Sequence, residues 1–346
     1  MDEPIERSES RTWPTAQGSV AAIRTIIPGL LFSIVIGMAA TFVSNAYGGP
    51  TVLFALLLGM AFNFISSESR LSSGVVFASR SILRLGVAAL GARITTEQIL
   101  GLGWSALVGV SIAVALTIGF GFLAAMLMGF RRRFGVLTAG AVAICGASAA
   151  AAISAVLPRH ENHERDTVFT IIAVTALSTI AMVLYPVIAH ALHFTHAQSG
   201  VFLGGTIHDV AQVVGAGYSV SPETGDVATI IKLLRVALLV PTVLIISLLN
   251  RRVAPQRSGV QRPSLLPAFL IAFIALVALN SLHLIPPIVQ SGLSDFSRWC
   301  IVIAIAALGV KTSLAALAEV GHQAVALMVA ETAFIAAFVL VLVHVA

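Results

Sequence analysis

The chain has 346 residues, of which 58% are hydrophobic and 10% are charged, and its formal net charge at pH 7 is +5. A mean hydropathy of +0.99 excludes a soluble globular domain, because a soluble protein of this size needs far more polar surface. The composition predicts an all-α polytopic membrane protein.

Residues 1–20 form a polar tail of mixed charge, and residues 21–346 are predicted to form one transmembrane domain. The tail lacks the features of a cleaved secretory signal, so the first apolar segment is expected to remain as a helix. A bilayer core needs about 20 apolar residues per helix. By that measure we predict eleven spans, at residues 21–43, 50–66, 74–93, 100–128, 134–157, 166–192, 197–218, 225–249, 265–283, 296–314 and 321–345.

Arginines in the loops predict the orientation of these spans. With the N-terminus in the cytoplasm, ten arginines fall in cytoplasmic segments, and only Arg93, Arg159 and Arg165 fall in external loops. This bias follows the positive-inside rule and predicts a cytoplasmic N-terminus and an external C-terminus. We therefore attribute the basic loops to membrane topology and expect no nucleic-acid partner.

Four cations lie at membrane depth, paired at helical spacing on the third and eighth spans: Arg80 with Arg84, and Lys232 with Arg235. Asp209 and Glu331 are the acidic residues at similar depth, which leaves an excess of two positive charges. Because buried charges are costly in a bilayer, this excess favours an anionic substrate. The alternative is that Lys232 and Arg80 extend to the membrane surface.

The fifth and seventh spans are predicted to be broken helices. In the fifth, Gly146 precedes Ser148, which could cap a restarting helix, and in the seventh Gly204 and Gly205 precede Thr206. The N-terminus of a restarting helix attracts anions through its free N–H groups and its dipole. Packing of small residues between neighbouring helices is the alternative reading.

A polar cluster follows the second break. His208 and Gln212 are four residues apart and share a helix face, and Asp209 lies beside that face. Histidine titrates near neutral pH, so this cluster could couple proton movement to transport. It could equally be a fixed hydrogen-bonded group that orients the break, and the sequence leaves both readings open.

An internal repeat is visible in the sequence. Residues 89–93 match residues 307–311 at an offset of 218, and Asn63 and Asn280 end the spans that precede them. The matching spans are two to four and nine to eleven, which run in opposite directions. Inverted repeats are typical of secondary transporters, although chance similarity can arise in such a biased composition. The two breaks do not fit the inversion, because both lie in spans that run the same way.

These residues resemble the sulfate exporter family of bacterial inner-membrane proteins, the YeiH-like group. The resemblance covers nearly everything after about residue 25, and rests on residues 83–86 with Gly91, 144–148, 205–217, 232–235 and 307–311. Residues matched in place are Arg84, Cys145, Gly146, Ser148, His208, Gln212, Lys232 and Arg235, with an acidic residue expected at Asp209. The resemblance implies an inner-membrane location and the architecture of cation–proton antiporters and bile-acid transporters, in which a core bundle moves against a static panel.

The sequence therefore predicts an elevator-type secondary transporter that exports a small anion such as sulfate, sulfite or a sulfonate. Its core is expected to contain spans three, five, seven, eight and ten. Predicted substrate-binding residues are Gly146, Ser148, Gly205, Thr206, Gln212, Arg84, Lys232 and Arg235. His208 and Asp209 are expected to carry the coupling ion, with a proton preferred over sodium.

Two rival functions stay open. One is a sodium-coupled carrier of a small carboxylate, in which Asp209 binds the ion and the arginines are structural. The other is an intramembrane enzyme that uses His208 and Asp209 as acid and base, although the sequence shows no nucleophile. No cofactor, metal site or catalytic residue is predicted, and helix faces rich in small residues allow a homodimer without specifying one.

Overall fold

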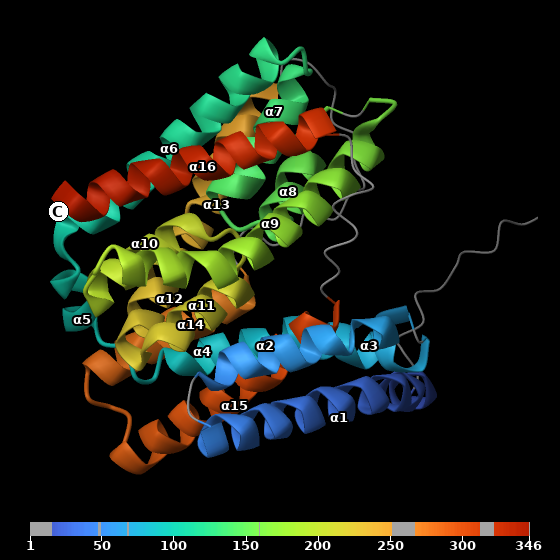
Figure 1. Ribbon diagram of the computed structural model, residues 1–346, viewed down its shortest axis with the longest axis vertical. Helices are drawn as coiled ribbons and strands as arrows, with labels where there is room; N and C mark the ends of the chain where they lie inside the picture. The colour runs from blue at the N-terminus through green and yellow to red at the C-terminus, as the bar shows by residue number, and fades with distance from the viewer. Residues whose placement is uncertain are drawn as a thin grey trace, which may run out of the picture.

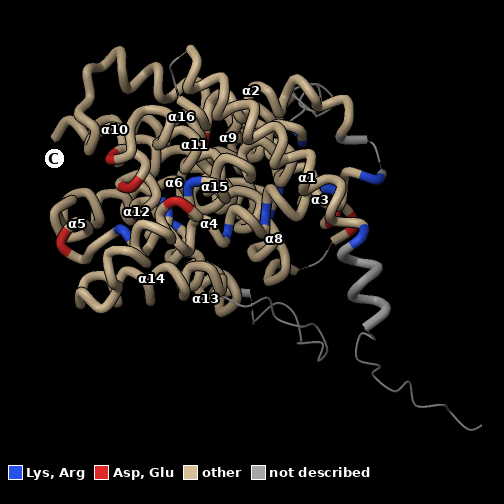
Figure 2. The backbone as a smooth tube through the Cα atoms, turned by 90° about the horizontal axis from the view of Figure 1, so that it is seen from below, with Lys and Arg blue, Asp and Glu red and all other residues tan. Residues whose placement is uncertain are grey.

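The computed structural model describes residues 16–47, 50–67, 69–158, 160–250, 267–311 and 322–345. These residues form helices and their connections, with no strand in the described ranges (Figure 1). Charged residues are sparse along the helices (Figure 2). Seven described helices are long and apolar enough to cross a membrane: Arg24–Tyr47, Arg70–Leu90, Gly103–Leu127, His163–Ala191, Pro222–Leu249, Pro287–Lys311 and His322–Val345. The prediction of an all-α polytopic membrane protein is confirmed.

The helices form two layers (Figure 1). The first, which we call the scaffold layer, contains α1 (Ala16–Tyr47), α2 (Thr51–Ala61), α3 (Ser69–Phe77), α4 (Leu83–Leu90), α14 (Ala268–Ser281) and α15 (Pro287–Lys311). A short 3-10 helix, Asn63–Ser67, follows α2, and a π-helical turn, Ala78–Ile82, joins α3 to α4.

The second layer, which we call the bundle layer, contains α6 (Gly103–Leu127), α7 (Arg132–Ala143), α8 (Ala147–Val156), α9 (His163–Ala191), α10 (His196–Thr206), α11 (Val210–Val220), α12 (Pro222–Ala237), α13 (Leu239–Asn250) and α16 (His322–Val345). The short helix α5 (Thr96–Gly101) leads from the scaffold layer into α6. Spans three and ten were expected in the moving core, but as α3–α4 and α15 they pack with α1 and α2 in the scaffold layer.

The long helices separate a lipid-facing side from a protein-facing side. On α6, Val108, Ile112 and Leu116 are exposed at four-residue spacing, whereas Gly109 and Ala113 are buried. Side chains four residues apart lie on one helix face, and a large apolar face suits lipid. The small residues on the other face allow close packing against neighbouring helices.

Both spans predicted to be discontinuous are broken, although the second break lies after the predicted glycine pair, and each break reverses the chain. Helices α7 and α8 meet at residues 144–146, and Arg133 Nη1 donates to the carbonyl of Pro158 at 3.2 Å. A helix that continued straight would separate those two residues by more than 30 Å at about 1.5 Å per residue. Segment 132–156 is therefore a re-entrant hairpin, here called hairpin 1.

Segment 196–220 is a second re-entrant hairpin, here called hairpin 2. Helices α10 and α11 meet at residues 207–209. The hydroxyl of Ser221 lies 3.2 Å from His196 Nδ1, so the two ends of the segment return to the same place. Predicted spans five and seven thus enter and leave on one side. Of the other nine predicted spans, seven match described helices long enough to cross a membrane, and spans 50–66 and 265–283 contain the shorter helices α2 and α14.

The hairpins also explain why the two breaks did not fit the inverted repeat, since both had been placed in spans that run the same way. The 29-residue helix α9 connects the end of hairpin 1 to the start of hairpin 2, so the two hairpins enter from opposite sides of the molecule. Arg165, predicted to be external, lies at the start of α9 on the same side as the base of hairpin 1. Arg93 lies at the opposite end, beside the base of hairpin 2.

Reciprocal contacts support the repeat in the scaffold layer. Asn63 Nδ2 donates to the carbonyl of Val310 at 2.8 Å, and the matching Asn280 Nδ2 donates to the carbonyl of Ile94 at 3.1 Å. The matched glycines Gly91 and Gly309 behave alike, since a Cβ at either would collide with a backbone carbonyl of the neighbouring helix. Helices α2 and α15 thus pack in the same way as α14 and α4.

Candidate functional site

The two hairpin tips meet in the interior of the bundle layer. Two contacts join the tips: Val142 of hairpin 1 contacts His208 of hairpin 2, and Ala147 of hairpin 1 contacts Asp209 of hairpin 2. His208 Nδ1 lies 3.1 Å from the carbonyl of Val142, and the N–H of Ala147 donates to Asp209 Oδ1 at 3.3 Å. Each tip brings the C-terminus of one short helix and the N-terminus of the next to the same point. The site therefore contains two helix ends of each polarity.

Lys232 joins the two tips from α12. Its side chain is fully buried, and its Nζ donates to the carbonyl of Ile144 at 2.6 Å and to that of Ile207 at 3.0 Å. One carbonyl comes from each tip. The ammonium group therefore links hairpin 1 to hairpin 2 and satisfies carbonyls that a helix C-terminus leaves without partners.

Arg235, one turn further along α12, makes four hydrogen bonds to backbone carbonyls and is also fully buried. Its Nε donates to Ala143 at 2.8 Å and its Nη2 to Val142 at 2.9 Å. Its Nη1 donates to Gly204 at 3.0 Å and to Ile207 at 2.9 Å. The guanidinium group thus caps α7 and α10 together.

The positive charges of Lys232 and Arg235 face the negative ends of two helix dipoles. The excess of cations was predicted to be balanced by a travelling anion. In this conformation the backbone carbonyls of the two tips balance much of this positive charge. They accept hydrogen bonds from both side chains. A direct contact between these two residues and a substrate stays a prediction.

Asp209 is the acidic residue at the junction. It is the N-cap of α11, and its N–H donates to Ser178 Oγ at 3.0 Å. The carboxylate also accepts from Ala147 at the positive end of α8, an arrangement that suits a negative charge. Unlike His208, Asp209 is only partly buried.

Gly146 makes this arrangement sterically feasible. It is the N-cap of α8 with φ +62° and ψ −128°, a conformation that favours glycine, and a Cβ there would collide with the carboxylate of Asp209. We expect Gly146→Ala to lower the free energy of unfolding by about 1–3 kcal/mol and to displace Asp209 from α8. Thermal unfolding of the purified protein measures this.

Gly292→Ala is the matched control, because a Cβ at Gly292 on α15 would meet nothing within 4 Å. It is expected to leave the unfolding temperature unchanged or slightly higher. Equal unfolding temperatures for the Gly146 and Gly292 variants would contradict the packing described for the tip.

His208 and Gln212 are buried inside the bundle layer. His208 Nε2 lies 3.0 Å from Thr332 Oγ1 on α16, so both ring nitrogens have partners. Gln212 Nε2 donates to Thr179 at 3.4 Å, and its carbonyl oxygen has no hydrogen-bond partner among the described residues. This geometry matches the reading of a fixed polar cluster for His208, and a coupling role for it stays a prediction.

The break predicted at Gly204–Gly205 is wrong in position. Helix α10 continues through both glycines and ends at Thr206, whose hydroxyl donates to Phe202 within the same helix. A Cβ at Gly204 would collide with the carbonyl of Ala228, so this glycine serves close packing of α10 on α12. Gly205 and Thr206 are buried and offer no free group to a substrate in this conformation.

Two other predicted residues have different surroundings. Ser148 was predicted to cap α8, but Gly146 is the cap and Ser148 lies exposed in the first turn. Arg84 is exposed on α4 in the scaffold layer, and no described contact connects it to the hairpin tips. The structure thus brings together Gly146, His208, Asp209, Lys232 and Arg235, and leaves Arg84 apart.

The hydroxyl groups of α9 and α16 were not among the predicted site residues. Thr175, Ser178 and Thr179 recur at helical spacing on α9, and Thr332 on α16 holds His208. A polar stripe within an otherwise apolar span is a visible sequence signal. It could have been used to predict that α9 faces the broken helices.

Comparison with known proteins identifies the family. The family model described as conserved hypothetical protein 698 matches residues 28–329. A UPF0324 membrane protein of Chlorobaculum tepidum is 56% identical over 90% of this chain and 88% of its own length. The UPF0324 membrane protein TauZ of Paracoccus denitrificans is 53% identical over 93% of this chain and 96% of its own length. The chain therefore belongs to the family described as conserved hypothetical protein 698, whose curated relatives are named UPF0324 membrane proteins.

Proposed function

We propose that this protein is a secondary active transporter of a small anion, with its substrate site at the meeting point of the two hairpin tips. The observation that carries this proposal is the pair of re-entrant hairpins, which enter from opposite sides and meet at buried cations. In secondary transporters, the substrate site is typically formed by discontinuous helices near the middle of the membrane. The two-layer arrangement supplies a scaffold against which the other layer can move.

The anion would bind at the N-terminus of α8, where Ser148 and the first-turn N–H groups have no carbonyl partners within the helix. Asp209 already places a carboxylate oxygen on one of those N–H groups. An ionised Asp209 would repel an incoming anion, and a protonated Asp209 would not. Anion and proton are therefore expected to bind together, and His208, Lys232 and Arg235 would hold the tips in place.

Orientation follows the arginine distribution, with the base of hairpin 1 and the N-terminus placed in the cytoplasm of a bacterial cell. At an inside-negative potential, export of an anion is favoured by about 2.3 kcal/mol per charge at 100 mV. Movement of a proton in the same direction offsets that electrical term. The direction of net flux then depends on the sum of the anion and proton gradients.

Flux through proteoliposomes tests the proposal. We expect labelled sulfate, sulfite or taurine to cross in the presence of the protein and to respond to an imposed pH gradient. Dicarboxylates and a sodium gradient form the comparison arms, because a sodium-driven carboxylate flux would favour the rival carrier. No flux of any of these anions, with or without a pH gradient, would defeat the proposal.

A further inference from the structure

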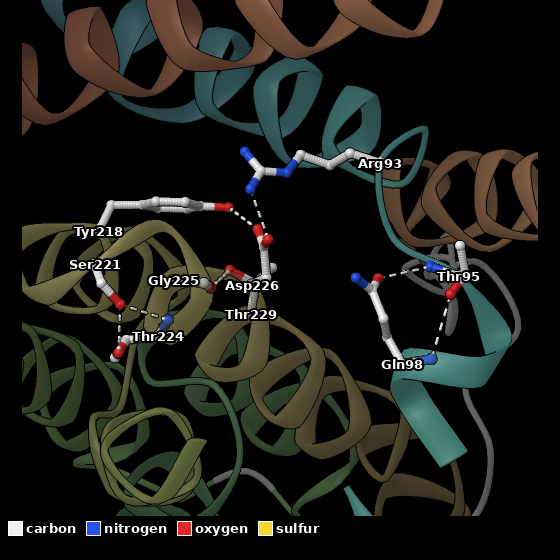
Figure 3. A network of polar contacts seen from close by, with 9 residues as sticks. All are labelled: Arg93, Thr95, Gln98, Tyr218, Ser221, Thr224, Gly225, Asp226 and Thr229. Atoms are coloured by element: carbon white, nitrogen blue, oxygen red, sulfur yellow. Dashed lines mark hydrogen bonds and ion pairs between the residues drawn. The ribbon is translucent and has the colours of Figure 1, made fainter. Parts of the chain in front are cut away.

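An ion pair joins the scaffold layer to the bundle layer beside hairpin 2. Arg93, just after α4, donates through Nη2 to Asp226 Oδ2 on α12 at 2.7 Å (Figure 3). The hydroxyl of Tyr218 on α11 donates to Asp226 Oδ1 at 2.5 Å. The side chains of Arg93 and Asp226 are 30% and 17% exposed, so water only partly screens the pair. The other two ion pairs among the described residues each lie within one layer.

The second helices of the two hairpins meet the scaffold differently. Helix α11 of hairpin 2 packs on α2 and α15, and Val213, Val214 and Ala216 are fully buried. Helix α8 of hairpin 1 packs mainly on α7, α9 and α13, all in its own layer. Ser148, Ala151 and Ala155 form an exposed face on α8. Within the described residues, the bundle layer is thus closed on the scaffold layer along hairpin 2 and open along hairpin 1.

The exposed face of α8 differs from a lipid-facing surface. Helix α6 exposes large apolar side chains such as Val108, Ile112 and Leu116. Helix α8 exposes only small residues, as expected for a surface that another protein layer approaches closely.

The inverted repeat supplies a comparison for Arg93. Its repeat partner is Lys311, at the end of α15 on the other side of the scaffold. Lys311 is exposed, lines a cavity of about 130 Å³ with Ser72, Val75 and Val76, and forms no ion pair with any described residue. Among the described residues, Arg93 is therefore paired with a carboxylate of the other layer, whereas its repeat partner Lys311 forms no ion pair.

We propose that Arg93, Asp226 and Tyr218 form a latch that holds hairpin 2 closed against the scaffold, and that the latch must release before the site opens on that side. This role for the latch depends on the proposed transport function. Arg93 and Asp226 are positioning residues, since they lie at the edge of the layers and act on access to the hairpin tips.

Cysteine accessibility tests the latch without a known substrate. Reporter cysteines replace Val214, which is fully buried on α11, and Ala151, the exposed residue at the equivalent position of α8. Each full-length variant is placed in nanodiscs and reacted with a hydrophilic maleimide. The native Cys145 and Cys300 are buried, and the protein without a reporter measures their background.

Ala151→Cys is expected to react fast and Val214→Cys slowly. Adding Arg93→Gln or Asp226→Asn is expected to raise the Val214→Cys rate about tenfold, the effect of losing one charge-assisted hydrogen bond. The charge-reversed double variant, R93D with D226R, is expected to restore slow labelling. Arg298→Gln is the matched control, because its pair with Asp295 lies within α15.

A Val214→Cys rate that stays constant in both single variants, or that rises equally with Arg298→Gln, overturns the latch. Should the single variants unfold, Tyr218→Phe removes only the hydroxyl, and a rate that it leaves unchanged overturns the latch as well. Labelling that shifts as expected in a protein without flux keeps the latch and removes the transport proposal. Flux in a protein whose labelling rate does not change keeps the transport proposal and removes the latch.

Discussion

Replacing Arg235 with methionine is expected to lower the free energy of unfolding by about 3–5 kcal/mol. The guanidinium group is fully buried and makes four hydrogen bonds to the carbonyls of both hairpin tips. Methionine fills a similar volume but has no donor. The carbonyls of Ala143 and Gly204 would lose their bonds from Arg235, and only Lys232 and His208 would remain to bind Ile207 and Val142. The tips would then separate, and the flux expected from the proposed function would stop.

Thermal unfolding in detergent measures this effect. Lys232→Met should destabilise the protein less than Arg235→Met, because Lys232 makes two such bonds where Arg235 makes four. Arg298→Met is the control, because the side chain of Arg298 is 74% exposed. If the Arg235 and Arg298 variants unfold at the same temperature, Arg235 does not hold the tips together.

Replacing Asp209 with asparagine is expected to remove the coupling of flux to the pH gradient. Asparagine has nearly the same shape and can still accept from the N–H of Ala147, but it cannot bind and release a proton. One unit of pH gradient corresponds to about 1.36 kcal/mol per proton. With one proton per anion, the wild-type protein should therefore accumulate the anion about tenfold per pH unit, and the variant should not accumulate it.

Labelled sulfate, sulfite or taurine in proteoliposomes provides the measurement, at pH gradients of either sign. Exchange of anion at equal pH should persist in the variant, which separates lost coupling from lost binding. Accumulation that still follows the pH gradient in Asp209→Asn would show that the proton binds elsewhere. Accumulation that follows sodium in the wild-type protein and vanishes in the variant would assign sodium binding to Asp209.

Several features of the site could be predicted from the sequence because they depend on local pattern. Hydropathy located the long helical segments, and Gly146 marked the first break. The cost of burying charge pointed to Lys232, Arg235 and Asp209 before any contact was known. The offset between residues 89–93 and 307–311 indicated the repeat, whose matched asparagines and glycines make equivalent contacts.

Other features could not be predicted, and Gly204 illustrates why. A glycine pair in a membrane helix permits either a break or close packing, and only its neighbour, here the carbonyl of Ala228, decides between them. Arg84 illustrates the same point for charge. Its spacing on α4 is clear in the sequence, but its distance from the hairpin tips depends on which layer α4 joins.

Amino-acid order alone established a helical membrane protein with two interrupted segments and buried charges, because apolar length and residue chemistry act locally. The three-dimensional arrangement decided that the interrupted segments turn back as hairpins, since hydropathy records the length of a segment but not its direction after a break. It also decided the partners of Lys232 and Arg235. Those partners are backbone carbonyls, which every residue carries, so no side-chain pattern could reveal them.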